Sequence, residues 1–399
     1  MPMHPRNFVR LLAVVVAVAL LAVSSTRSGA EELFAYSPGS HQQGELRYAD
    51  GVPLLIVQGS PEEIGQQVGT LAGAAAKDLI RYPRRLLKAR SADWAWSKLV
   101  QLGGLMQPQF PSGQRSELAA IAASAQLRRD EVIAANVMPD AYRMFGCSSL
   151  IVDASRSESG GPLLGRNLDF PSLQMLHRYS LVMVVRPHGK HRFASVGFPG
   201  LVGCLSGMND AGLVLAIHEV SASRDGSAPF EREGVPYAMA FRRVLEECKT
   251  VEQAAALLRG VKRTTRVNLA VCDRQGGAVF EITPKTLVVR RGEKGMAACT
   301  NHFRSRELSV GRGGTRYRKL AACFAVRKVG VDLVARKLHE VHQGEQTLQT
   351  MIFEPRTLTL HLAIGGTPSS AQPLKKLELA ELLSTEDSSQ SQNASNVSP

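Results

Sequence analysis

The sequence has few of the residues that build disulfide or metal scaffolds. Its 399 residues include only six cysteines, with no Cys-x-x-Cys pair and no zinc-ligand spacing. There is no Gly-x-Ser-x-Gly nucleophile elbow, and the glycine-rich stretch 311–315 lacks the Gly-Lys-Ser/Thr ending of a phosphate loop. These absences argue against a disulfide framework, a zinc module, an elbow-type serine hydrolase and a P-loop protein. We expect no metal and no other cofactor.

Long apolar runs are also scarce. The run at 11–23 has about 13 residues, short of the roughly 20 that a membrane-spanning helix needs. It follows Arg6 and Arg10 and precedes small residues at 28–30, which is the pattern of a secretory signal peptide. We therefore expect residues 1–30 to direct export to the periplasm, the medium or a lysosome. The mature chain is expected to have no stable membrane insertion.

The charge is positive but not concentrated. Lys and Arg number 48 against 35 Asp and Glu, a formal net charge of +13. The basic residues come as scattered pairs with little aromatic interleaving, so we expect a solvated basic surface and no nucleic-acid partner. An apolar fraction of 44% fits a folded globular protein with one large core or two ordinary ones. The oligomeric state stays open.

One predicted hairpin carries the residues best suited to chemistry. The apolar runs 148–153 and 163–168 flank a turn that is rich in Ser and Gly, which predicts two antiparallel strands. In such a hairpin the end of the second strand returns beside the start of the first. We therefore expect Arg166 and Asp169 to lie near Cys147, so that a guanidinium, a carboxylate and a thiol share one edge of a sheet.

The sequence before this hairpin and the sequence after it differ in their predicted secondary structure. Before it the pattern is mostly helical, with a strand at 54–57, a helix from Ile64 to about Lys88 with Ser60 as N-cap, and helices at 92–106, 114–124 and 129–137. After it we expect strands at 180–186, 191–196, 202–208, 213–220, 267–272, 278–282, 287–290, 296–300, 347–353 and 357–363, and helices at 236–248, 251–259, 316–327 and 331–339. This alternation predicts two stacked antiparallel sheets with helices on their outer faces. The tail 384–399 is expected to be disordered.

Six short motifs, in order along the chain, carry a family resemblance. The chain resembles the N-terminal nucleophile (Ntn) hydrolases, specifically the group around acyl-coenzyme A:6-aminopenicillanic acid acyltransferase. Choloylglycine hydrolase, penicillin V acylase and acid ceramidase are more distant relatives. The motifs are GSPEEIGQQVG at 59–69, GCSS at 146–149, GRNLD at 165–169, GMNDAGL at 207–213, TNH at 300–302 and GTRY at 314–317.

The resemblance implies an α+β fold, a four-layer αββα sandwich preceded by a mostly helical pre-segment. It also implies a precursor that cuts itself between Gly146 and Cys147. The pre-segment would be 31–146, released or retained as a small subunit, and the catalytic domain 147–383. Glycine suits the position before the cut because it lacks a Cβ and allows a strained, approachable peptide.

The resemblance also implies a role for each site residue. Cys147 would be the nucleophile and supply its own base, because an α-amine and a thiol both titrate near neutral pH. Asp169 would orient that amine, and Arg166 would favour the thiolate. Asn301 would donate to the oxyanion, and Arg316 would complete the charge network.

Each of these residues also has an ordinary structural reading. Cys147 would then be a small buried hydrophobe, and Arg166 and Asp169 an ion pair that closes the hairpin. Asn301 would be a turn residue, and Arg316 an ordinary arginine at a helix start.

The sequence departs from the family pattern near the end of the strand that follows Leu213. Relatives tend to carry an oxyanion-hole asparagine there, whereas His218 and Glu219 stand here. A ring nitrogen of His218 or a backbone N–H would have to donate instead, so the second oxyanion donor stays open. His218, Phe170 and Phe198 are candidate substrate-binding residues.

The function expected from sequence is an exported, self-processing cysteine hydrolase. It would cleave a C–N amide bond in an N-acylated small molecule through an acyl-enzyme thioester. Transfer of the acyl group to an amine or thiol acceptor would make it an acyltransferase. A non-catalytic binding protein on the same scaffold, with an intact Gly146–Cys147 bond, is a third hypothesis. Neither the acyl group nor the amine can be read from the sequence.

Overall fold

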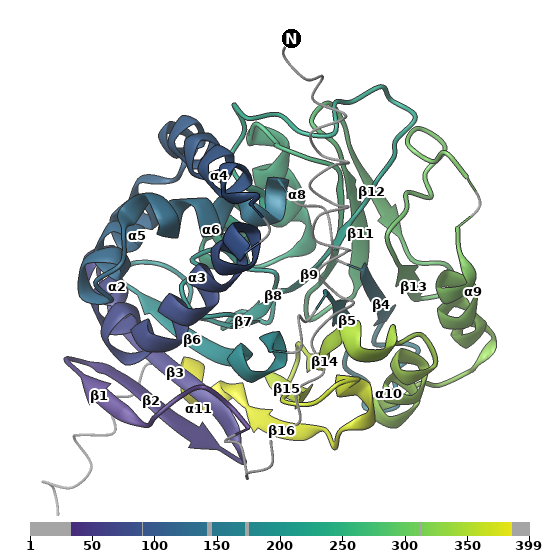
Figure 1. The fold of residues 1–399 in the computed structure, drawn as a ribbon. Helices are drawn as coiled ribbons and strands as arrows, with labels where there is room; N and C mark the ends of the chain where they lie inside the picture. The colour runs from purple at the N-terminus through teal and green to yellow at the C-terminus, as the bar shows by residue number, and fades with distance from the viewer. Residues whose placement is uncertain (1–32, 90, 142–145, 172–174, 312, 385–399) are drawn as a thin grey trace, which may run out of the picture.

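The computed structural model describes residues 33–384 except 90, 142–145, 172–174 and 312. The expected signal peptide, 1–30, and nearly all of the expected disordered tail lie outside the described residues, so both stay predictions. The described chain forms two stacked β-sheets with helices on their outer faces (Figure 1). This is the α+β, αββα arrangement predicted from sequence.

The smaller sheet contains the predicted hairpin. Its six strands all pair antiparallel, in the order β13 (Met296–Cys299), β4 (Gly146–Val152), β5 (Leu163–Asp169), β14 (Thr347–Glu354), β15 (Thr359–Ala363) and β16 (Lys375–Glu378). β4 and β5 are the two strands of the hairpin, with Gly146 opposite Asp169. The hairpin prediction is therefore confirmed, whereas β16 was not foreseen.

The larger sheet has ten strands and receives three of them from the pre-segment. Their order is β1 (Gly39–His41), β2 (Gly44–Ala49), β3 (Val52–Gly59), β6 (Leu181–Pro187), β7 (Phe193–Gly197), β8 (Ser206–Asn209), β9 (Val214–Glu219), β10 (Val267–Cys272), β11 (Gly277–Ile282) and β12 (Leu287–Arg291). β3 pairs with β6 in parallel, and the other neighbours pair antiparallel. Since β3 has both faces covered, it reads as an almost continuous apolar run.

Helices cover both outer faces of the paired sheets. α7 (Tyr237–Glu247) and α8 (Val251–Gly260) pack on the ten-stranded sheet, and Thr250 caps α8 as predicted. α9 (Thr315–Ala321) and α10 (Val331–Glu340) pack on the six-stranded sheet. The remaining short helices are η2 (Gln107–Gln109), η3 (Leu176–Tyr179), η4 (Ala322–Ala325), η5 (Gly344–Gln346), η6 (Ser369–Ala371) and α11 (Leu379–Leu383).

The pre-segment helices gather at one end of the molecule, on the left in Figure 1. They are α2 (Pro61–Leu71), α3 (Gly73–Ala89), α4 (Asp93–Met106), α5 (Ser112–Ser124) and α6 (Arg129–Ala141). Ser60 caps α2 through a capping box with Glu63, and Pro61 opens the helix. The single helix predicted from Ile64 to about Lys88 was wrong, because the chain leaves helical geometry at Ala72 and divides it into α2 and α3.

A buried ionic cluster joins the pre-segment to the rest of the protein. Arg242 of α7 lies 2.7 Å from Glu117 of α5 and 2.7 Å from Glu246 of its own helix. All three side chains are at most 3% exposed. One hydrophobic core also runs through both parts and includes residues of β3, α2, α5 and α7. The pre-segment is therefore integrated into the fold by pairing, charge and packing.

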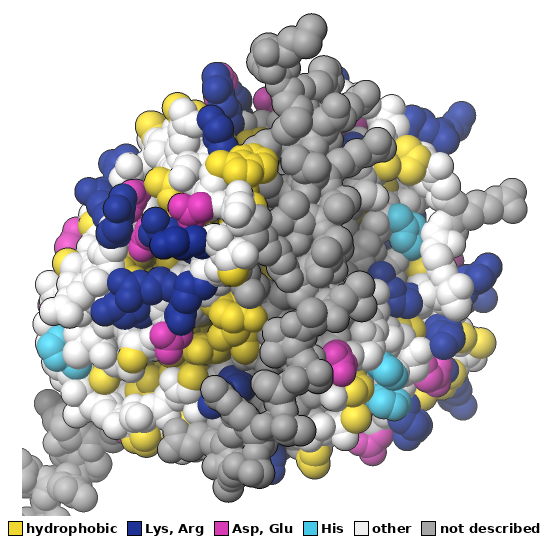
Figure 2. Space-filling model, viewed as in Figure 1, with side chains coloured by type: hydrophobic (Ala, Val, Ile, Leu, Met, Phe, Trp, Pro, Cys, Tyr) yellow, Lys and Arg dark blue, Asp and Glu magenta, His cyan; other side chains and the backbone are white. Residues whose placement is uncertain are grey.

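The described surface carries its basic residues in a spread pattern. In Figure 2 Lys and Arg side chains are dispersed over the visible face, and several of them lie on the left, over the pre-segment helices. No helix within the described ranges is long and apolar enough to cross a membrane. All six cysteines fall in the described part of the chain, where each is buried and free of a disulfide.

We predict that Glu117→Gln destabilises the protein by about 3 kcal/mol, because it leaves the buried Arg242 guanidinium with one partner fewer. The free energy of unfolding in urea measures the effect. Glu247→Gln is the matched control, since it breaks the solvent-accessible Arg243–Glu247 pair on α7, the helix that also carries Arg242. This substitution should change stability by less than about 1 kcal/mol. Equal effects of the two substitutions would contradict the proposed importance of the buried cluster.

Candidate active site

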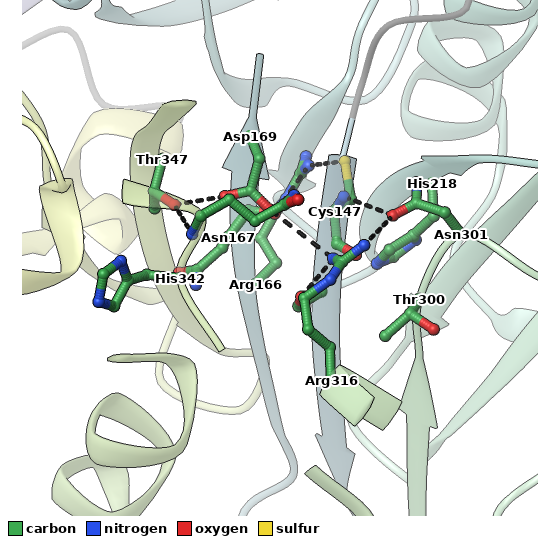
Figure 3. A network of polar contacts seen from close by, with 12 residues as sticks. Cys147, Arg166, Asn167, Asp169, His218, Thr300, Asn301, Arg316, His342 and Thr347 are labelled. Atoms are coloured by element: carbon green, nitrogen blue, oxygen red, sulfur yellow. Dashed lines mark hydrogen bonds and ion pairs between the residues drawn. The ribbon is translucent and has the colours of Figure 1, made fainter. Parts of the chain in front are cut away.

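Cys147 lies at the second position of β4, buried between the two sheets. Its Sγ accepts a hydrogen bond of 3.0 Å from Nη2 of Arg166, which comes from β5. Asp169 ends β5 opposite Gly146, so the carboxylate also lies at this edge of the sheet (Figure 3). The structure thus brings together the thiol, guanidinium and carboxylate that the hairpin predicted.

The guanidinium of Arg166 is fully buried and directed at the thiol. It also donates to Leu205 O at 3.2 Å, to Ser206 Oγ and to Ile217 O at 3.4 Å. These acceptors lie at or beside β8 and β9 of the facing sheet, so the cation is fixed across the sandwich. A charged donor held next to Cys147 Sγ favours the thiolate, which is the direction that the family resemblance implies for Arg166.

Burial outweighs this favourable charge in the uncut chain. It raises the pKa of Cys147 to about 12, while Arg166 lowers it and the Asp169 and Glu219 carboxylates raise it further. The thiol is therefore protonated at neutral pH while the Gly146–Cys147 peptide is intact. Arg166 acts in the predicted direction without determining the outcome.

Both carboxylate oxygens of Asp169 are engaged. Oδ1 accepts from Thr347 Oγ1 at 2.6 Å, and Oδ2 accepts from Gln343 Nε2 at 2.7 Å. Arg316 Nη1 lies 3.8 Å from Oδ2. Burial raises the pKa of Asp169, and the two hydrogen bonds and the nearby guanidinium oppose that rise. Thr347 and Gln343 were not foreseen from sequence, because no local pattern relates them to β5.

Asn301, two residues after the end of β13, and Arg316, in α9, complete the site. Asn301 Oδ1 accepts from the backbone N–H of Cys147 at 2.8 Å and from Arg316 Nη2 at 3.0 Å. Arg316 Nη1 donates to Cys147 O at 2.7 Å and to Ser148 Oγ at 2.9 Å. Asn301 Nδ2, the donor expected for an oxyanion, donates to Glu219 O at 2.9 Å in the uncut chain.

A buried asparagine on β10 holds the segment that carries Asn301. Asn268 Nδ2 donates to Thr300 O at 2.9 Å and to His302 O at 3.0 Å, the two carbonyls that flank Asn301. Its side chain is 1% exposed. Asparagine is depleted in strand interiors, and that was the one sequence signal that could have identified Asn268.

His218 and Glu219 lie at the end of β9, at the departure from the family pattern. His218 is fully buried with Nε2 2.8 Å from Ser149 Oγ, two residues beyond Cys147. Burial, together with Arg166 and Arg316, lowers its pKa well below the usual value, so the ring is neutral. The Glu219 carboxylate accepts from Tyr237 OH at 3.0 Å. The second oxyanion donor remains open, because the described contact of the His218 ring is with Ser149.

The two candidate substrate-binding aromatics border the same core. Phe170 directly follows Asp169, Phe198 directly follows β7, and both are half-buried against the large hydrophobic cluster. Their contact with a substrate stays a prediction. Among the described residues no group of three His, Cys, Asp or Glu side chains is arranged to hold a metal ion.

The thiol of Cys147 lies between the two sheets. Asn301 binds the backbone N–H of this residue, and Arg316 binds its carbonyl oxygen. This arrangement fits the resemblance to the Ntn hydrolases. The family model described as acyl-coenzyme A:6-aminopenicillanic acid acyl-transferase matches residues 156–317, and that described as penicillin amidase matches residues 21–212. The chain is therefore similar to both families, each over part of its length, and its layered fold agrees with the resemblance described from the sequence.

Individual relatives are distant. An uncharacterised protein of Archaeoglobus fulgidus is 25% identical over 276 residues, which are 60% of this chain but only 45% of that protein. A Caenorhabditis elegans orthologue of N-acylethanolamine-hydrolyzing acid amidase has a TM-score of 0.40 and 16% identity, covering 52% of this chain and 93% of its own. A conjugated bile acid hydrolase variant from Clostridium perfringens has a TM-score of 0.44 and 15% identity, covering 59% and 93%. Penicillin V acylase from Agrobacterium tumefaciens has a TM-score of 0.39 and 13% identity, and the match covers 59% of this chain and 86% of that protein.

We predict that Cys147 in uncut protein reacts slowly with iodoacetamide at pH 7–8, and that its rate rises about tenfold per pH unit up to about pH 12. The sign follows from burial, because a raised thiol pKa lowers the thiolate fraction at every pH below it. The tryptic peptide 144–156 spans the Gly146–Cys147 bond, so its mass reports uncut chains alone. Chains unfolded in urea are the control and should label near an ordinary thiol pKa. A plateau in native labelling below pH 9 would contradict the prediction.

Proposed function

We propose that this chain is an exported, self-processing cysteine hydrolase of the Ntn class, which cleaves an amide C–N bond of an N-acylated small molecule. The observation that carries the proposal is the way Cys147 is held. Its Sγ, backbone N–H and carbonyl are bound by Arg166, Asn301 and Arg316, respectively. These contacts support the proposal that one residue, Cys147, serves as both nucleophile and prospective base. The apolar run at 11–23 supports export.

Self-processing would begin with attack of Cys147 Sγ on the Gly146 carbonyl carbon. A C–S bond forms, the Gly146–Cys147 C–N bond breaks, and the thiol proton ends on the departing nitrogen. Water then hydrolyses the thioester, leaving a carboxylate on Gly146 and a free thiol and α-amine on Cys147. Asn301 Oδ1 already accepts from that nitrogen, so the new amine is generated at a hydrogen-bond acceptor.

The cut changes the electrostatics of the thiol. A positively charged amine on the same residue lowers the pKa of Cys147, opposing the burial that raises it in the uncut chain. A free α-amine has a pKa of about 8, so it accepts the thiol proton near neutral pH. The intact chain is thereby kept inactive, and cleavage itself supplies the missing base.

Turnover would use the same groups on a second amide. The Cys147 thiolate attacks the substrate carbonyl, Arg166 holds the sulfur, and the α-ammonium returns its proton to the departing amine. Water, deprotonated by the α-amine, then releases the acid from the thioester. For Asn301 Nδ2 to donate to the oxyanion, it must exchange its bond to Glu219 O for one to substrate. Loss of such a donor typically raises the barrier by about 3 kcal/mol.

The substrate class rests on the two family descriptions. Penicillin amidase and acyl-coenzyme A:6-aminopenicillanic acid acyl-transferase are both named for chemistry at an acylated amine. The second description favours the alternative in which an amine or thiol acceptor replaces water. Both routes share the thioester on Cys147, so they differ only in the final acceptor.

We predict that purified wild type divides between Gly146 and Cys147, whereas Cys147→Ala remains whole. Intact mass and N-terminal sequencing should show fragments that end at residue 146 and begin at Cys147. The fragments should elute together from a size-exclusion column, because β3, the Arg242 cluster and the shared core join them. Cys299→Ala, which removes another buried thiol, is the control and should still cut. A wild-type chain that stays uncut and still turns over amides at full rate would overturn the proposal. A separate comparison of the products formed with and without an added amine distinguishes a hydrolase from an acyltransferase.

A further inference from the structure

Gly146 is in contact with a side chain that the proposed chemistry has not used. A Cβ built on Gly146 would overlap Nε2 of Gln343 and lie 3.3 Å from Asp169 Cβ. Gln343 precedes η5, far from the hairpin in sequence, and is half-buried. Its amide therefore occupies the space that any side chain at position 146 would need.

The same amide fixes the carboxylate of Asp169. Gln343 Nε2 donates to Asp169 Oδ2, while the Gln343 backbone N–H donates to Thr347 Oγ1 at 2.8 Å. Thr347 Oγ1 in turn donates to Asp169 Oδ1. The two ends of one turn thus hold both carboxylate oxygens, and we call this pair of residues the 343/347 clamp.

The clamp is linked to the bond that would be cut. Asp169 Oδ2 lies 3.8 Å from Arg316 Nη1, and that nitrogen donates to the carbonyl of Cys147. Arg316 Nη2 donates to Asn301 Oδ1, which accepts from the Cys147 N–H. The orientation of Oδ2 therefore helps to place the groups on both sides of the nitrogen that departs.

We propose that Gln343 is a positioning residue for self-cleavage, acting through Asp169, and that it is the side chain that restricts position 146 to glycine. The inference rests on the proposed function and adds a residue to it. Any Cβ at position 146 displaces the Gln343 amide from Oδ2, so a fully buried carboxylate loses one of its two hydrogen-bond donors and its fixed orientation. On this view the glycine requirement comes from the neighbour as well as from the backbone.

Two substitutions separate the hydrogen bond from the space that Gln343 fills. Gln343→Met keeps a side chain of similar length without a donor, and should slow self-cleavage about ten- to a hundredfold, as the loss of a hydrogen bond to a charged group implies. Gln343→Ala removes both. Chains are made by cell-free translation with a labelled pulse, and the uncut fraction is followed by gel and intact mass. Gln346→Ala, at an exposed position of the same turn, is the matched control and should cut at the wild-type rate.

The restriction on position 146 is tested by a double-mutant cycle. Gly146→Ala should cut more slowly than wild type, and the further loss that Gly146→Ala causes on the Gln343→Ala background should be smaller than the loss it causes in wild type, since the overlap with Gln343 is gone. Gly146→Ala with Gln343→Met should show no such relief, because the space remains filled. This pattern of rescue would not arise from a general loss of stability, and melting temperatures measured on Cys147→Ala backgrounds check that each chain folds.

The outcomes divide cleanly. Wild-type rates for Gln343→Met and Gln343→Ala would overturn the positioning role, and additive losses in the double variants would overturn the account of Gly146. In both cases wild-type cleavage at Cys147 would leave the proposed function standing. A wild type that is never cut would overturn that function and this inference together.

Discussion

The register of β4 against β5 is the constraint on which the site depends. Gly146 faces Asp169 and Ser149 faces Arg166, so the thiol of Cys147 meets a cation and a carboxylate that come from one short strand. Since side chains alternate in a strand, a slip by one residue would reverse the face of every side chain in it. Fully buried apolar positions along both strands oppose such a slip. The core packing of this hairpin therefore determines where the side chains of Cys147, Arg166 and Asp169 lie at its open end.

Burial has opposite effects on the parts of this site. It fixes Arg166 by hydrogen bonds across the sandwich, which gives a preorganised positive charge beside sulfur. It also raises the pKa values of Cys147 and Asp169, disfavouring the ionised forms on which the proposed reaction relies. The pre-segment sustains this state, because it shares a sheet and a core with the other layers. The intact protein is thus well suited to holding a protonated thiol in an assembled site.

What the sequence predicts here depends on the range of the interaction. The hairpin and the meeting of Arg166 with Cys147 follow from local alternation and antiparallel pairing alone. Asn301 and Arg316 contact Cys147 from 154 and 169 residues away, so only the family resemblance could indicate them. Gln343 had neither kind of signal, because a polar residue in a turn looks like any other. The break at Ala72 and the small strands β1, β2 and β16 were missed for a related reason, since their ends are decided by tertiary pairing.

The charges around the sulfur suggest why a severed backbone would matter more than any single side chain. Arg166 and Arg316 provide two cations and Asp169 and Glu219 two carboxylates, so these four groups in their ionised forms sum to zero around a neutral thiol. A thiolate added to this set would be an unbalanced buried charge, which proteins avoid. An ammonium on the backbone nitrogen, beside Asn301 Oδ1, restores the balance within one residue. In the proposed reaction, ionisation of the sulfur would therefore be coupled electrostatically to liberation of the nitrogen.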